Sequence, residues 1–393
     1  MKRGLALEGG GAKGAYHIGV IKAFVENGHE FDGFVGTSIG AVNAAVLAQG
    51  DFDKALAIWS RISNDHIFVP DEQPLLQLTN IKGLEINTDF ITNVRSALTK
   101  VISGKGISTE KMLDFLNRHI NEEKVRASGK DFGLVTFSIS DRKPYELLLE
   151  DIPPGKLIDY IMASASFPGF RSVIVDGKKY VDGGLYNNCP VNLLDKLEYD
   201  EIVAIRVGSP GIVTKKIRQM KNVKIISPSE DLGNMMQFSP ETSTANIVLG
   251  FYDGLRFIKK LRGSYYYINP VEEDMFIKKL MALQNNIIFE VGKIMGISSA
   301  YGEPILFEKI IPRLGTHLKL DANFDYADFV IALLEKKAKQ CNIERYKLYD
   351  YHQLCALVKG VKPNSSKSVK DLFMTPPSLR NEAAIALLSN VLL

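Results

Sequence analysis

A glycine-rich segment near the start of the chain has the residue types of an anion-binding turn. Gly9-Gly10-Gly11-Ala12-Lys13-Gly14 follows a short apolar run and precedes a helical pattern. Glycines leave backbone N–H groups unobstructed, and the N-terminus of the following helix attracts negative charge. The segment also fits the G-x-G-x-x-G pattern of dinucleotide sites. Taken alone, it is compatible with nucleotide binding, with stabilisation of an oxyanion, or with a purely structural turn.

A serine stands at the centre of a second segment, Gly36-Thr37-Ser38-Ile39-Gly40, between an expected strand and an expected helix. This is the G-x-S-x-G pattern of a nucleophile elbow in its strand–turn–helix context. Gly36 and Gly40 leave room for a turn so tight that larger side chains would collide. The pattern predicts that Ser38 is an exposed nucleophile. The alternative is a glycine-rich turn with an incidental serine.

A serine nucleophile needs a base, and Asp182, followed by Gly183 and Gly184, is a candidate. A carboxylate can accept the serine proton if a partly apolar environment raises its pKa. The same three residues also suit an ordinary turn. A conventional triad would place a histidine after the acid. Only His317 and His352 follow Asp182, and both lie in the C-terminal region that we expect to be mainly helical, in surface or packing roles.

Periodicity predicts the elements that position these residues. Short apolar runs predict strands at 4–7, 31–35, 132–139, 145–149, 173–175, 179–181, 202–207 and 223–226, and helical patterns cover 12–27, 39–49, 51–63, 109–120 and 156–165. The stretch 64–108 is polar and irregular. Further helices are expected at 244–262, 272–297, 326–340 and 367–393. We therefore expect an α/β unit to about residue 270 and a helical region from 271 to 393.

Composition excludes several classes of protein. The 393 residues are 46% hydrophobic and 24% charged, with a net charge of +3, which argues against disorder and against a strongly basic nucleic-acid-binding surface. Cys189, Cys341 and Cys355 are too few for a disulfide framework and lack zinc spacing. No apolar run reaches the ~18 residues of a membrane span or the core of a signal peptide. We expect a cytoplasmic protein with no nucleic acid partner, no metal and no other cofactor.

The three motifs together resemble the patatin-like phospholipase family. That family combines a glycine-rich oxyanion loop near the N-terminus, a G-x-S-x-G elbow and a downstream D-G-[GA] motif. Residues 162–168 (MASASFP) and 182–190 (DGGLYNNCP) also resemble segments of the family. The resemblance covers residues 4–207 and does not extend to 271–393.

The resemblance implies a three-layer α/β/α fold with a mainly parallel central sheet. It also implies a lipid acyl hydrolase of the phospholipase A or lysophospholipase type. Ser38 would attack a carboxylic ester and form an acyl-enzyme, while Asp182 would accept the serine proton. The oxyanion would bind backbone N–H groups of Gly10 and Gly11, with Gly9 as a third candidate. The supporting positions of the motifs are Lys13, Gly14, Gly36, Gly40, Gly183 and Gly184.

The expected partner is a lipid or lysolipid, met by transient contact with a membrane surface. The basic segment 215–221 (KKIRQMK) is the candidate for that contact, with an ordinary solvated segment as the alternative. Two other functions stay open. One is a dinucleotide-binding oxidoreductase, disfavoured because Glu30 and Asp32 precede Phe34-Val35, whereas the ribose-binding acid should lie at the C-terminal end of the second strand. The other is a catalytically silent effector with the same fold.

Overall fold

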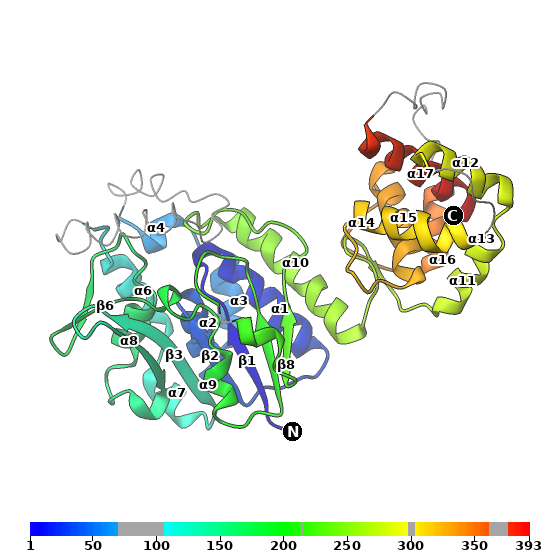
Figure 1. Cartoon of the computed structure of the whole chain (residues 1–393). Helices are drawn as coiled ribbons and strands as arrows, with labels where there is room; N and C mark the ends of the chain where they lie inside the picture. The colour runs from blue at the N-terminus through cyan, green and yellow to red at the C-terminus, as the bar shows by residue number, and fades with distance from the viewer. Residues whose placement is uncertain (70–105, 214, 298–302, 361–375) are drawn as a thin grey trace. The chain divides into compact units, whose positions relative to one another are not determined.

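A computed structural model describes residues 1–69, 106–213, 215–297, 303–360 and 376–393 (Figure 1). The chain divides into two compact units, Met1–Leu255 and Arg256–Leu393. The division falls within helix α10 (Pro240–Lys259). The boundary expected near residue 270 therefore lies shortly after the end of that helix.

The first unit is built on one eight-stranded, mainly parallel sheet with the strand order β5-β6-β3-β2-β1-β7-β8 and β4 beside β3. Strands β8, β7, β1, β2 and β3 are parallel, whereas β4, β5 and β6 pair antiparallel with their neighbours. The strands are β1 (Arg3–Leu7), β2 (Gly33–Thr37), β3 (Asp131–Ser138), β4 (Lys143–Leu148), β5 (Val173–Val175), β6 (Lys178–Asp182), β7 (Glu201–Ile205) and β8 (Val223–Ile226). The predicted α/β class with a mainly parallel sheet is confirmed.

Helices cover both faces of this sheet, because successive strand residues point to opposite sides. On one side Val35 of β2 shares a buried cluster with Leu194 of α9. The next residue, Gly36, faces α2, where an added Cβ would lie 2.1 Å from the carbonyl carbon of Gly40. The result is three layers. Besides α10, the helices are α1 (Ala15–Glu26), α2 (Ile39–Ala48), α3 (Phe52–Trp59), α4 (Asn64–Ile67), α6 (Glu110–His119), α7 (Glu122–Ala127), α8 (Leu157–Ser164) and α9 (Val191–Asp195), with 3₁₀ turns η1 (Gly11–Gly14), η3 (Leu149–Asp151), η4 (Gly183–Leu185) and η5 (Lys215–Arg218).

Two strands that run in opposite directions pair with the same edge of β3. β2 pairs in parallel with the first part of β3, and β6 pairs antiparallel with the last part of β3. β4 pairs with β3 along both parts and therefore takes the other edge. The C-terminal ends of β2 and β6 consequently meet on one edge of β3: Thr37 lies opposite Val135, and Asp182 lies opposite Thr136.

The predicted strands and helices of the first unit are present, with three additional helices. Helices α4, α7 and α9 lie where no helix was predicted, because four, six and five residues are too short to set up a helical periodicity. Residues 70–105 of the predicted irregular stretch lie outside the described residues. The basic segment 215–221 begins with η5, and Arg218 and Lys221 are exposed. The side chains of Lys215 and Lys216 lie outside the described residues.

The second unit is mainly helical, as predicted, and has its own buried core that includes Phe276, Phe329 and Leu388. The helix predicted at 272–297 is divided in two by a turn. The elements after α10 are β9 (Tyr267–Ile268), α11 (Glu273–Met281), α12 (Asn285–Met295), α13 (Glu303–Ile305), the π-helix η6 (Leu306–Ile310), α14 (Ile311–His317), α15 (Tyr326–Gln340), β10 (Leu348–Tyr349), α16 (Tyr351–Lys359) and α17 (Pro377–Leu392). Within the described ranges, none of the helices combines the length and the apolar character that crossing a membrane requires.

Candidate active site

Ser38 occupies the tight turn between β2 and α2. Its φ of 56° lies in a region that residues with a Cβ rarely adopt. Gly36 and Gly40 make the turn possible by close backbone contact. A Cβ on Gly36 would collide with Gly40, and one on Gly40 would lie 2.2 Å from the carbonyl oxygen of Leu7. A strained serine between a strand and a helix is the geometry of a nucleophile elbow.

Ser164, the last residue of α8, holds the backbone of Ser38. Its Oγ accepts the N–H of Ser38 at 2.9 Å and donates to the carbonyl of Val135 at 2.7 Å. Ser164 is fully buried. Sequence reasoning assigned it no role, although it belongs to the small-residue segment 162–168. Through this serine the elbow is attached to the middle of β3.

Asp182 is buried at the end of β6, beside the elbow. Its N–H donates to the carbonyl of Ser166 at 2.8 Å, and its Oδ1 accepts the N–H of Gly184 at 2.7 Å. Burial raises the pKa of Asp182 to about 6, although hydrogen bonds from the Ser38 side chain and the Gly184 N–H lower it. Gly183 allows the chain to pass close to β3, since its Cβ would lie 2.1 Å from the Val135 oxygen. Such a carboxyl group is ionised at neutral pH and can still take up a proton.

The glycine loop presents two backbone N–H donors to the site, those of Gly10 and Gly11, whereas its neighbouring N–H groups are used within the protein. Gly9 donates its N–H to the Asn188 carbonyl at 3.0 Å, and Ala12 donates to the Met235 carbonyl at 2.7 Å. No hydrogen bond to the described residues occupies the N–H of Gly10 or Gly11. Gly11 has φ 55°, and a Cβ there would lie 2.1 Å from the Met235 oxygen. The loop therefore depends on glycine at position 11.

Long-range contacts hold this loop in place. The side-chain amide of Asn188 donates to the Gly9 carbonyl at 3.4 Å and to the Ser209 hydroxyl at 3.0 Å. Ser209 in turn donates to the Gly9 carbonyl. Glu8 is fully buried and pairs with Arg206 at 2.7 Å. Sequence reasoning assigned these side chains no role, although Asn188 belongs to the segment 182–190, because their partners are up to 200 positions away.

The remaining positions of the loop motif support its structure. The Nζ of Lys13 donates to the Gly208 carbonyl at 3.4 Å. Gly14 lets the loop pack closely against the Trp59 ring, whose nearest atom would lie 2.9 Å from an added Cβ. Both residues therefore have structural partners of their own, in addition to any effect of the Lys13 charge.

The histidines of the sequence do not complete a triad among the described residues. Nε2 of His317 lies 2.8 Å from Oε1 of Glu382 in the second unit, where His352 is exposed. The side-chain partners of Asp182 are Ser38 and Gly184. In the described ranges, no group of three or more His, Cys, Asp and Glu side chains is placed to hold a metal ion.

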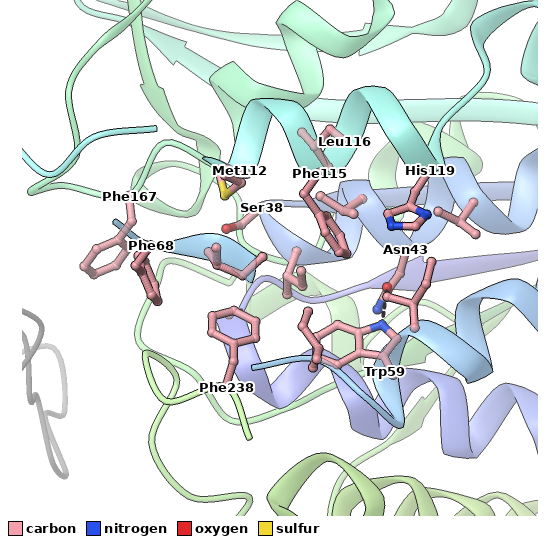
Figure 2. Close-up of a pocket in the computed structure, with 18 of the residues that line it drawn as sticks. Ser38, Asn43, Trp59, Phe68, Met112, Phe115, Leu116, His119, Phe167 and Phe238 are labelled. Carbon is pink, nitrogen blue, oxygen red and sulfur yellow. Dashed lines mark hydrogen bonds between the residues drawn. The ribbon is translucent and has the colours of Figure 1, made fainter. Parts of the chain in front are cut away.

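Ser38 lines two pockets. The larger has about 860 Å³ of empty space, part of it open to solvent. Its apolar side chains include Val42, Trp59, Phe68, Phe115, Phe167 and Phe238 (Figure 2). The smaller pocket is more polar and is lined by Ser38, Asp182, Asn188 and Ser209, among others.

The fold and this site define an α/β protein with a serine elbow and a buried acid. Residues 5–195 match the family model described as Patatin-like phospholipase, and this part of the chain belongs to that family. The resemblance noted from the motifs is confirmed.

The curated relatives are much longer proteins. "Patatin-like phospholipase domain-containing protein 7" of Rattus norvegicus is 27% identical over 208 residues, which span 52% of this chain and 13% of that protein. "Lysophospholipase NTE1" of Kluyveromyces lactis is 29% identical over 211 residues, which span 52% of this chain and 12% of that protein. Among solved structures, VipD from Legionella pneumophila aligns with a TM-score of 0.39 and 15% identity, covering 98% of this chain and 83% of that one.

Proposed function

We propose that the protein hydrolyses carboxylic ester bonds of lipids, as a phospholipase A or lysophospholipase, through Ser38 and Asp182. The observation that carries this proposal is the strained Ser38 hydrogen-bonded to the buried Asp182 at an apolar pocket. Membership of residues 5–195 in the patatin-like phospholipase family supports the same reaction class.

In the first step, Ser38 Oγ attacks the ester carbonyl carbon and Asp182 takes the serine proton. The negative charge that develops on the carbonyl oxygen is stabilised by the N–H groups of Gly10 and Gly11. Gly9 is left out of this oxyanion hole, because its N–H already donates to Asn188. Asp182 then protonates the departing alcohol, and the acyl group stays on Ser38.

In the second step, water attacks the acyl-enzyme. Asp182 takes a proton from that water and passes it to Ser38 Oγ as the acyl–oxygen bond breaks, which releases Ser38 as the alcohol together with the free acid. The two pockets suggest how the substrate is oriented. The acyl chain enters the larger, apolar pocket, and the alcohol part lies in the smaller pocket beside Asn188 and Ser209. We also propose that brief contact with a membrane surface delivers the lipid to the site.

The dinucleotide alternative rests on the glycine loop alone. One donor of that loop, the N–H of Gly9, is already used within the protein. The residue that follows β2 is Ser38, where a ribose-binding acid is expected in dinucleotide sites. The loop and the residue after β2 therefore favour ester hydrolysis over dinucleotide binding.

We expect the activity to depend on the ionisation of Asp182. Its pKa is raised to about 6, and only the carboxylate accepts the serine proton. The value of kcat/KM for a soluble p-nitrophenyl ester should therefore fall tenfold per pH unit below about 6 and stay level above it. The measurement is a pH profile from 4 to 9 in one constant-ionic-strength buffer series. A flat profile down to pH 4 would contradict the role of Asp182.

We expect Gly11→Ala to lower kcat/KM by about 10²–10³, the typical cost of losing one oxyanion donor. The added methyl group must displace the Met235 carbonyl or turn the Gly11 N–H away from the site. Gly28→Ala is the matched control, because Gly28 also has a positive φ of 73° but a Cβ there meets no described atom within 4 Å. Both variants should lose some thermal stability, and only Gly11→Ala should lose activity. Equal activities of the two folded variants would exclude the loop from the mechanism.

A further inference from the structure

The apolar pocket beside Ser38 has polar groups that ester hydrolysis does not use. One wall is α2, which presents Ile39, Val42, Asn43 and Val46, and another is α6, which presents Met112, Phe115, Leu116 and His119. Both sets follow the spacing of one helix face. In Figure 2 His119 lies on the far side of Phe115 from Ser38, above Asn43 and Trp59.

His119 has an unused hydrogen-bonding atom at the pocket. Its Nδ1 is buried and has no hydrogen-bond partner among the described residues. Burial, together with the charges of Lys54 and Arg118, lowers the pKa of His119, so the imidazole is neutral at pH 7. A buried polar atom without a partner is unfavourable. A polar group of a ligand placed there would satisfy it.

Asn43 provides a second polar position. Its Oδ1 accepts the indole N–H of Trp59 at 2.9 Å, a bond drawn in Figure 2. Its Nδ2 donates to the Gly14 carbonyl at 3.0 Å and lies 3.3 Å from Nδ1 of His17. An amide oxygen accepts two hydrogen bonds, so Oδ1 retains one free position. The orientation of the amide is held by these three partners.

The position of His119 along the pocket sets the length of the acyl chain that reaches from Ser38 to His119. Its carbonyl accepts the side-chain N–H of Gln49 at 2.9 Å, which places His119 beside the end of α2. Ser38 precedes the start of α2, and at about 1.5 Å per residue Val46 lies about 12 Å and Gln49 about 16 Å further along the helix axis. An extended chain with C–C bonds of about 1.5 Å advances about 1.3 Å per bond, so this depth holds roughly nine to twelve bonds.

We propose that this pocket binds acyl chains of about ten to twelve carbons that carry a hydroxyl group at or near the far end, with His119 Nδ1 and Asn43 Oδ1 as its partners. The inference rests on the proposed function in taking the apolar pocket as the acyl site. A hydroxyl both donates and accepts, so it can serve both atoms. An unsubstituted chain leaves His119 unpaired, and a terminal carboxylate brings an unpaired charge into an apolar site.

Binding can be measured without catalysis. Trp59 is the only tryptophan of the chain and lines the pocket, so its fluorescence reports occupancy directly. Titration with decanoic acid and 10-hydroxydecanoic acid should give about tenfold tighter binding of the hydroxy acid, the value of one net hydrogen bond. His119→Phe keeps a ring of similar size without its nitrogens and should remove this preference, so that decanoic acid binds at least as well as its hydroxylated form.

Two further variants separate the effect of losing the His119 nitrogen from the effect of introducing a phenyl ring. Asn117→Phe places the same ring on the exposed side of α6 and should bind both acids as the parent does. His119→Gln retains a polar atom and should keep part of the preference. His119→Phe is expected to fold, because Nδ1 has no partner to lose. Equal affinities of the parent for the two acids, or an unchanged ratio in His119→Phe, would overturn the proposal.

Hydrolysis of p-nitrophenyl decanoate and p-nitrophenyl 10-hydroxydecanoate tests the hydroxyl preference separately from the proposed function. If the parent hydrolyses both at equal kcat/KM, the hydroxyl preference is wrong and the proposed function stands. If it hydrolyses neither, and Trp59 fluorescence still prefers the hydroxy acid, the binding site stands and the proposed function is wrong. A tenfold preference in kcat/KM that His119→Phe removes would support both.

Discussion

Replacing Ser38 with alanine is expected to lower kcat/KM for lipid and p-nitrophenyl esters by on the order of 10⁶, the effect of removing the nucleophile from a serine hydrolase. Without Oγ no acyl-enzyme forms. The variant should fold normally, because alanine meets the same backbone strain at φ 56° as serine does. Hydrolysis is measured with purified protein over a substrate series, and folding by thermal denaturation.

A matched control for this substitution is Ser60→Ala. The Ser60 hydroxyl donates to the Leu56 carbonyl at the end of α3, so it is a helix-end serine with an ordinary partner. Its loss should leave kcat/KM unchanged. Ser38→Ala should still bind decanoic acid, as followed by Trp59 fluorescence, because the pocket is intact. A clean Ser38→Ala preparation that hydrolyses esters at the parental rate would refute the nucleophile.

Asp182→Asn is expected to lower kcat/KM by about 10²–10⁴, the usual contribution of a general base. The same change should stabilise the folded protein above pH 6. Burial raises the pKa of Asp182 from 3.8 to about 6, so the folded state binds this proton more tightly than the unfolded state. The stability that the protonated acid contributes is therefore complete below about pH 4 and is lost as pH rises through 6. By linkage, about two pKa units correspond to about 3 kcal/mol at pH 7 and above.

Asparagine at position 182 removes the free-energy cost of ionising a buried carboxyl group, because it is neutral at every pH. Its Oδ1 can still accept the Gly184 N–H. The free energies of unfolding of parent and variant should differ at pH 8 and converge near pH 4. Asp53→Asn on the exposed side of α3 is the control and should change neither quantity. A variant that loses activity and is also less stable at pH 8 would indicate a structural role for the carboxylate. A fully active variant would remove Asp182 from the mechanism.

Local sequence was sufficient for the strands and longer helices of the first unit and for two motifs that each lie within one turn. The elbow around Ser38 needs only a strand, a helix and glycines at positions 36 and 40, all of which are adjacent in sequence. The Asp176-Gly177 turn between β5 and β6 is similar, since both residues adopt the positive φ values that a tight hairpin requires. Short-range sterics decide such features, so the sequence by itself determined them.

Only the tertiary structure decided how these pieces meet. Asp182 reaches Ser38 because β3 pairs with β2 and β6 on one edge, and that register depends on contacts between segments more than 40 residues apart. The same holds for Ser164 under the elbow and for Asn188, which takes the N–H of Gly9 and leaves Gly10 and Gly11 as donors. His119 reaches the pocket through the packing of α6 near α2. Pairing and packing over such distances follow from the whole core, and no local pattern of residues encodes them.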